Sequence, residues 1–270
     1  MGFEHFNIGG YALEHIDSIW TFVLLTVRYG ILMMLLPGFV TSPTGKMVRM
    51  PGILALALIS TVASPTASLT EHLGVLLLQV ISEALFGLTL GIIPLLIVSG
   101  VQMAGGLSST TMGLGASQLV DPTMGGSLPA LGRLMGDLVI LIFLLSNGHH
   151  AIVYSAAGLG GVIIPGTFVP GANSLELIIS RVADVFRLGV LISAPVIVAL
   201  MLTNFVMGLI SKAIPQVNIF IVSFPLTIGI GLILTALSLP ELTVFIEREL
   251  MDVESGLLVV LSDVQIVARN

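Results

Sequence analysis

The chain has 270 residues, of which 56% are hydrophobic and only 9% are charged, and its mean hydropathy is +1.11. A soluble domain carries about a quarter charged residues, so this composition excludes a soluble domain and predicts an all-α polytopic membrane protein. The net charge of −6 argues against nucleic acid as a partner, and the absence of cysteine excludes disulfides and thiolate chemistry.

Six apolar segments reach, or come close to, the roughly 20 helical residues that crossing a bilayer requires. They are 18–37, 51–65, 73–103, 127–146, 187–210 and 217–240. The second is short, and the third is long enough to extend beyond the hydrocarbon core or to break at Pro94. A seventh stretch, 151–169, is rich in glycine and proline, and we expect a loop or re-entrant segment packed on protein.

Basic residues in two connecting segments predict the orientation of the chain. Lys46 and Arg49 follow the first span, and Lys212 lies between the last two. The positive-inside tendency places both segments in the cytoplasm, and six spans then place both termini outside. Arg181 and Arg187 fall on the outer side in this arrangement and count against it.

Two amphipathic segments accompany the last pair of predicted spans. The first runs from a cap at Asn173 or Ser174 to about residue 187. The second is the acidic tail, 241–270, where apolar residues recur every three or four positions from Leu242 to Leu257. Such a face packs on a partner helix, on a membrane surface or on its own chain, and the pattern leaves all three open.

Charged residues interrupt the apolar segments where lipid tolerates them least. They are Arg28, Glu83, Arg133 and Asp137. A charge at bilayer depth is costly unless it is paired or faces water, so we expect these helices to pack on other protein or to line an aqueous path. The simplest interpretation pairs Arg133 with Asp137, and Glu83 with a basic partner such as Arg28. The alternative is a proton or ion relay.

Glycines accompany these charges at helical spacing. Gly87 and Gly91 share one helical face with Glu83 and form a GxxxG pair, which permits close contact between helices. A second pair, Gly132 and Gly136, brackets the Arg133 position. We expect both pairs to lie at helix or subunit contacts.

Residues 103–126 stand between two apolar segments and contain six glycines and three methionines. We expect a loop here, and its permissive backbone and soft apolar side chains suit a plug that seals a pore. The plug residues would be Met103, Gly105, Gly106, Met112, Gly113 and Gly115. Composition by itself favours an ordinary surface loop that ends at the Asp121-Pro122 turn.

Motifs of catalysis and metal binding are missing from the sequence. His149 and His150 are adjacent and point in different directions, so we interpret them as polar residues at a helix end. No HExxH, GxSxG or P-loop pattern is present. We therefore expect no enzymatic activity, no cofactor and no metal.

An ordered set of short motifs closely resembles the FliR family of flagellar export-gate proteins and its SctT-type injectisome relatives. The set comprises Arg28, Pro37, Arg49, Glu83 with Gly87 and Gly91, Ala104-Gly105, Asp121-Pro122, 147–150, Pro165-Gly166, Pro195, Asn204, Gly208 and 211–220. The resemblance covers about residues 20–235. Lys212 stands where arginine is more common in the family, which retains a cation but loses a planar, bidentate donor.

The resemblance implies a modular helical fold. A FliP-like helical part, 1–186, would precede a FliQ-like helical hairpin, 187–240, and the acidic tail, 241–270, would follow. The cytoplasmic turn of the hairpin would hold Lys212, Pro215, Gln216, Asn218 and Phe220. The loop after Met103 would match the pore-closing plug of the family.

The resemblance also implies an assembly and a function. Family members join about five copies of FliP and about four of FliQ in a helical pseudo-hexameric gate, with FlhB around its cytoplasmic face. That gate lies in the bacterial inner membrane within the flagellar basal body and passes unfolded export substrates. The alternative is a stand-alone proton-coupled secondary transporter with Glu83 and Asp137 in its proton path, although the two halves of the chain show no convincing repeat.

Overall fold

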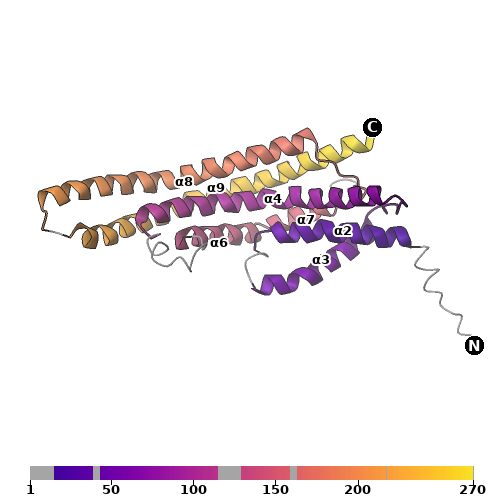
Figure 1. Cartoon of the computed structure of the whole chain (residues 1–270), viewed down its shortest axis with the longest axis horizontal. Coiled ribbons are helices and arrows are strands. Elements are labelled where there is room, and N and C mark those ends of the chain that lie inside the picture. The colour runs from indigo at the N-terminus through magenta and orange to yellow at the C-terminus, as the bar shows by residue number, and fades with distance from the viewer. Residues whose placement is uncertain (1–14, 39–42, 115–128, 159–162, 217, 270) are drawn as a thin grey trace, which may run out of the picture. The chain divides into compact units, whose positions relative to one another are not determined.

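The structure is a computed structural model that describes residues 15–38, 43–114, 129–158, 163–216 and 218–269. Within these ranges the chain forms helices and connecting segments and contains no strand, which confirms the all-α prediction. The helices shown in Figure 1 are α2 (Ile16–Leu35), α3 (Pro43–Ala63), α4 (Leu73–Met112), α6 (Ala130–Leu145), α7 (Gly148–Ala156), α8 (Ala172–Ala213) and α9 (Ile219–Arg269).

The described residues contain four helical stretches long and apolar enough to cross a membrane. They are Ile16–Leu35, Leu73–Met112, Ala172–Ala213 and Ile221–Glu249, and α6 with α7 makes a fifth if that bent pair is one broken span. The prediction of six spans was therefore wrong in number, and the orientation derived from it loses its basis. The apolar part of α3, Arg49–Ala63, is shorter than the roughly 20 residues that a membrane span requires.

The long helices exceed their predicted bounds. α4 is continuous for 40 residues through Pro94, α8 for 42 residues through Pro195, and α9 for 51 residues through Pro225 and Pro240. A proline removes one hydrogen bond from a helix interior but does not end a helix whose neighbouring turns are held by packing. α8 thus joins the amphipathic segment to the first hairpin helix across residue 186, and the division into FliP-like and FliQ-like parts stays a prediction.

The chain divides into two compact units. Unit 1 is Met1–Ile93, Asn147–Ile178 and Val253–Asn270, and unit 2 is Pro94–Ser146 and Ile179–Asp252. In unit 1, α2 packs beside α3 (Figure 1), and the Tyr29 hydroxyl shares a 2.6 Å hydrogen bond with Ser60 between the two helices. Leu25, Leu32 and Phe86 are fully buried there, so the core of unit 1 forms between α2 and the first part of α4.

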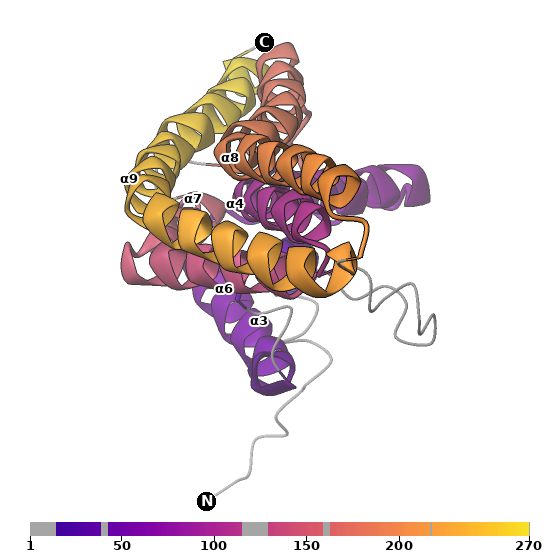
Figure 2. The ribbon, with the colours of Figure 1, turned by 90° about the vertical axis from the view of Figure 1, so that its left-hand side faces the viewer.

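Unit 2 contains the second part of α4, α6, and the part of the α8–α9 hairpin between Ile179 and Asp252. Figures 1 and 2 show these last two helices side by side and joined at the orange turn. Large apolar side chains on the hairpin point outward, and Val198, Phe205 and Leu237 are each 65% exposed or more. In an aqueous protein such a surface would be unstable, so the hairpin requires lipid or protein around it.

Candidate functional site

A buried ion pair joins α2 to α4 inside unit 1. Arg28 Nε lies 2.5 Å from Glu83 Oε2, and Arg28 Nη2 donates to Glu83 Oε1 at 2.9 Å. The side chains are 1% and 0% exposed. The fork of the guanidinium matches the carboxylate in a bidentate contact, which is the geometry that best offsets the cost of removing both charges from water. The predicted pairing of Glu83 with Arg28 is confirmed.

Two backbone groups provide further hydrogen bonds to the pair. Arg28 Nη1 donates to the Ala156 carbonyl at 2.8 Å, and the Gly166 N–H donates to Glu83 Oε1 at 2.6 Å. The Phe86 ring centre lies 4.7 Å from the guanidinium carbon, which adds a cation–π contact. The pair therefore links α2, α4, the end of α7 and the segment that follows it. We name Arg28, Glu83, Phe86, Ala156 and Gly166 the Arg28–Glu83 cluster.

A further hydrogen bond and a contact between two rings attach the irregular segment 163–171 to α4. The Ser82 hydroxyl donates to the Phe168 carbonyl at 2.7 Å, and the rings of Phe86 and Phe168 lie 4.9 Å apart. Gly166 has φ +84°, a conformation that glycine adopts without strain, and a Cβ there would lie 2.8 Å from Gln79 Cγ. The predicted irregular stretch thus begins only after α7, and its described part after residue 162 packs on protein, as expected.

The glycine pair on α4 sits where α2 crosses it. A Cβ on Gly87 would collide with the Arg28 carbonyl oxygen, and one on Gly91 would lie 2.8 Å from Leu35 Cβ. Close approach of α2 is what brings Arg28 within reach of Glu83. The prediction of a close helix contact is confirmed with α2 of the same chain as the partner, and a role in subunit packing stays a prediction.

The second glycine pair lies on the face of α6 that contacts α4. A Cβ on Gly132 would lie 2.8 Å from the Gln102 carbonyl oxygen, and one on Gly105 would lie 2.6 Å from Gly132 Cα. A Cβ on Gly136 would collide with the Gln102 side chain. Glycines from both helices therefore meet at one crossing in unit 2.

This crossing corrects the predicted loop. Met103, Gly105, Gly106 and Met112 all belong to α4 and are helical, because contacts with α6 stabilise residues whose composition suggested a flexible backbone. Gly113 follows in a turn with φ +87°, and Gly115 lies outside the described residues. The loop thus begins after Met112, and its role as a plug stays a prediction.

The end of α4 is attached to α9. Met112 is 1% exposed, and its carbonyl accepts a 3.2 Å hydrogen bond from the Thr227 hydroxyl. A Cβ on Gly113 would lie 2.8 Å from the Phe224 ring, and one on Gly231 would lie 2.5 Å from Met112 Cε. The residues that lead into the glycine-rich loop are therefore held in place.

The pairing predicted on α6 was wrong. Arg133 and Asp137 are both exposed, and within the described residues they form no ion pair with each other. Exposed pairs four residues apart contribute only about 0.3–0.5 kcal/mol, so nothing compels these side chains to meet. They face away from the α4 crossing that Gly132 and Gly136 occupy.

The predicted hairpin turn is present. α8 ends at Ala213 and α9 begins at Ile219, with Pro215 and Gln216 in a turn between them. Lys212 is exposed in the last turn of α8, where a cation complements the helix dipole. Asn218 accepts a 3.1 Å bond from the Ile221 N–H, and Phe220 lies in the first turn of α9. The cytoplasmic position of this turn stays a prediction.

His149 and His150 lie at the start of α7, directly after Asn147, whose φ is +59°. Their ring centres are 4.1 Å apart. Across the part of the chain that the structure describes, no group of three or more acidic or histidine residues is arranged to hold a metal ion. The histidines thus begin a short helix rather than end one.

Sequence reasoning missed the backbone partners of the Arg28–Glu83 cluster and the contact between Gln102 and α6. The Ala156 carbonyl and the Gly166 N–H carry no side-chain signature, so nothing in the sequence marks them as ligands of a charge. The sequence indicated Gly132 and Gly136 as a pair, but it did not indicate that they contact Gln102 on α4.

The described residues are helical apart from their connecting segments and contain four or five stretches apolar enough to cross a membrane, which defines the chain as a polytopic membrane protein. The family described as "Bacterial export proteins, family 1" matches residues 19–253, so the chain belongs to that family.

Curated relatives carry the name flagellar biosynthetic protein FliR. That of Escherichia coli K12 is 27% identical over 185 residues, which cover 68% of this chain and 71% of the relative. The Pectobacterium carotovorum protein is 30% identical over 184 residues, 67% and 70% of the two chains. The Caulobacter vibrioides protein is 33% identical over 175 residues, 63% and 69%. The chain is therefore a flagellar export component.

Proposed function

We propose that the chain is a non-enzymatic channel subunit of the flagellar export gate. It assembles with about five FliP-like and about four FliQ-like subunits into the pore through which unfolded flagellar proteins cross the inner membrane. FlhB contacts the cytoplasmic face, and the assembly lies in the flagellar basal body. Family membership over residues 19–253 supports this proposal.

The main structural support for the proposed assembly is the outward-facing apolar surface of the α8–α9 hairpin. In an apolar stretch of 18 residues taken from each helix, only 28% is buried within the chain for α8 and 17% for α9. The corresponding share for α4 is 61%. Subunits that join a helical assembly bury such faces against neighbours. The hairpin therefore offers the surface that FliP-like and FliQ-like helices cover.

The arrangement of the acidic residues weighs against a stand-alone transporter. Glu83 is buried and its oxygens accept bonds from Arg28 and Gly166, so its carboxylate is engaged rather than open to water. Asp137 belongs to the other unit and is exposed. Neither residue lines a described cavity, whereas a proton path requires carboxylates that exchange partners.

Purification in mild detergent tests the proposal. We expect the chain, expressed with the FliP-like and FliQ-like chains of its own cell, to appear in one complex containing several copies of each by native mass spectrometry. The chain expressed by itself serves as the control and should accumulate poorly. A single species, monomeric or homo-oligomeric and stable without companions, would contradict the proposal.

The plug proposal has its own test. We expect deletion of residues 115–126 to make the inner membrane leaky to ions while export continues, measured as membrane potential in growing cells. Replacement of the same residues by an equally long Gly-Ser sequence shows whether length or composition closes the pore. An unchanged potential in both variants removes the plug assignment and leaves the assembly proposal intact.

A further inference from the structure

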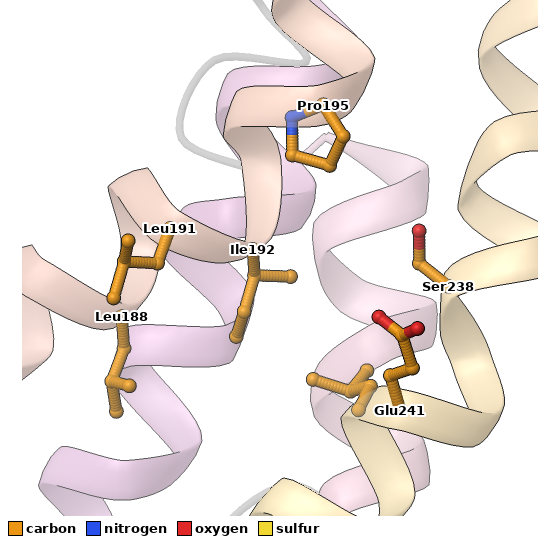
Figure 3. Close-up of a pocket in the computed structure, with 7 residues that line it drawn as sticks. Leu188, Leu191, Ile192, Pro195, Ser238 and Glu241 are labelled. Atoms are coloured by element: carbon orange, nitrogen blue, oxygen red, sulfur yellow. The ribbon is translucent and has the colours of Figure 1, made fainter.

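A cavity of about 240 Å³ lies between the helices of the hairpin in unit 2 (Figure 3). Its walls come from both helices, and the lining residues are Leu188, Leu191, Ile192 and Pro195 of α8 with Ser238, Glu241 and Leu242 of α9. Leu188 and Leu242 are about 95% buried and form the floor, since their exposures are 6% and 5%. Leu191 is 58% exposed at the rim, so the cavity opens outward.

One carboxylate stands beside these apolar walls, on the exposed residue Glu241. Figure 3 shows the Glu241 side chain on α9 directed toward the space that α8 borders. Glu241 is the one ionisable residue among the seven that line the cavity, and within the described residues it forms no ion pair. Ser238 already donates its hydroxyl proton to the Leu234 carbonyl at 2.9 Å, which leaves its oxygen as an acceptor.

Pro195 leaves the backbone carbonyl of one lining residue without its usual helical donor. Proline has no N–H, so the carbonyl of Leu191, four residues earlier on the same helix, has no i+4 donor. Leu191 and Pro195 both line the cavity. The cavity thus combines apolar walls, a negative charge and oxygen acceptors, and its lining side chains offer no positive charge.

We propose that this cavity receives a lysine or arginine side chain from an apolar helix of a neighbouring export-apparatus subunit. A basic side chain has an aliphatic stem that suits the leucine floor and a donor-rich cation that suits Glu241 and the Leu191 carbonyl. This inference rests on the proposed function, because it requires neighbouring subunits. Glu241 is the charged residue on this chain, and a lysine or arginine is its counterpart on the neighbour.

The surface beside the cavity fits a helix as the occupant. Apolar side chains continue along both hairpin helices, with Val198 66% exposed on α8 and Leu237 69% and Val244 59% exposed on α9. A helix laid along this surface buries these residues while its basic residue enters the cavity. Charge complementarity then fixes the register of the two helices.

Replacement of Glu241 in the co-expressed assembly tests the inference. We expect Glu241→Gln to lower the fraction of chain that remains in the complex by about tenfold, because it leaves the partner's cation unpaired at the interface. Glu247→Gln is the matched control, since Glu247 is exposed on the same helix outside the cavity lining. Equal assembly of the Glu241→Gln variant and the unmodified chain would overturn the inference alone. Failure of the unmodified chain to assemble would overturn the proposed function as well.

Two further variants identify the occupant. The chain has no cysteine, so Ser238→Cys supplies a unique thiol in the cavity wall, and we expect the assembly to protect it from a maleimide that labels it readily in the free chain. Arg187 is exposed one turn before Leu191, and Arg187→Gln should leave both protection and assembly unchanged. The inference would be overturned if the thiol were equally protected in the free chain, or if Arg187→Gln removed the protection. It would also be overturned if Glu241→Gln released bound phospholipid instead of a subunit.

Discussion

Arg28 and Glu83 form a contact in which every charged atom has a partner inside one unit. The guanidinium uses Nε and Nη2 on the carboxylate and Nη1 on the Ala156 carbonyl. Burial of an ion pair gives little net stability, but removal of one partner leaves an uncompensated buried charge. The pair therefore acts mainly as a requirement on how α2, α4 and α7 come together.

We expect Glu83→Ala to destabilise the chain by about 3–5 kcal/mol, because Arg28 then stays buried without a counter-ion. The double variant Arg28→Leu with Glu83→Leu should recover most of this loss, since it removes both charges. Asp137→Ala is the control and should change stability by less than about 0.5 kcal/mol, since Asp137 is exposed. Denaturant unfolding in detergent micelles, followed by circular dichroism, measures all three.

The opposite result has a distinct meaning. If Glu83→Ala unfolds like the parent chain and enters the complex in normal yield while proton-driven export falls, then Glu83 works as a relay. Stability and export thus separate the structural role from the transport role.

The charges of the cluster were predictable and its geometry was not. A chain with 9% charged residues offers few counter-ions to a buried glutamate. Arg28 was therefore one of a small number of possible partners for Glu83. The Ala156 carbonyl and Gly166 N–H lie 128 and 83 residues away from their partners in the chain. Only the tertiary arrangement brings them together, and no local pattern records it.

Among the helices, close crossings at glycine residues occur in both units. In unit 1 the α2–α4 crossing passes over Gly87 and Gly91, and in unit 2 the α4–α6 crossing passes over Gly105 and Gly132. Glycine at these positions allows backbones to approach at distances that any side chain would prevent. Glycine thus has a packing role at these positions, whereas the glycine-rich composition of residues 103–126 had suggested a flexible loop.

Two adjacent glycines provide a matched test of this interpretation. We expect Gly105→Ala to destabilise the chain by about 1–3 kcal/mol, because its Cβ would lie 2.6 Å from Gly132 Cα. Gly106→Ala meets nothing within 4 Å and should stabilise the helix by about 0.5–1 kcal/mol. Thermal unfolding of the two purified variants compares them directly. Stabilisation by both substitutions would show that α4 and α6 do not make this contact.

Element type was predictable from hydropathy, whereas element length was not. Apolar windows located α2, α4, α6 and the hairpin helices, because burial in a bilayer or in protein leaves a long apolar run. Hydropathy ended the third segment at residue 103, but α4 continues to Met112, whose side chain packs at Gly231. The contact that extends the helix comes from α9, more than a hundred residues later in the chain.

For the whole molecule, the two compact units do not follow the predicted division at residue 186. Unit 2 combines Pro94–Ser146 with Ile179–Asp252, so it takes residues from both sides of that position. Its internal contacts include the Thr227 hydroxyl on the Met112 carbonyl and a close approach of Gly189 to Met103. Residues on both sides of position 186 therefore pack within one unit, and the division at 186 stays a prediction.

This arrangement predicts the behaviour of fragments. We expect fragments 1–186 and 187–270, expressed separately, to be degraded, because each exposes its half of unit 2. Their co-expression should restore part of the yield, as measured by quantitative blotting of membrane fractions. A cut at residue 216, in the hairpin turn, provides the comparison, since it divides the hairpin at an exposed turn. Stable accumulation of 187–270 without its complement would show that the hairpin folds independently.

The hydrogen bond between the Trp20 indole N–H and the Gln79 side chain, 2.7 Å long, has a practical consequence. Trp20 is the single tryptophan of the chain, and Gln79 lies one helical turn before Glu83 on α4. The tryptophan fluorescence of the chain therefore has one source, located where α2 meets α4. Its emission wavelength reports separation of these helices without an attached dye, in the free chain as well as within an assembly whose other members lack tryptophan.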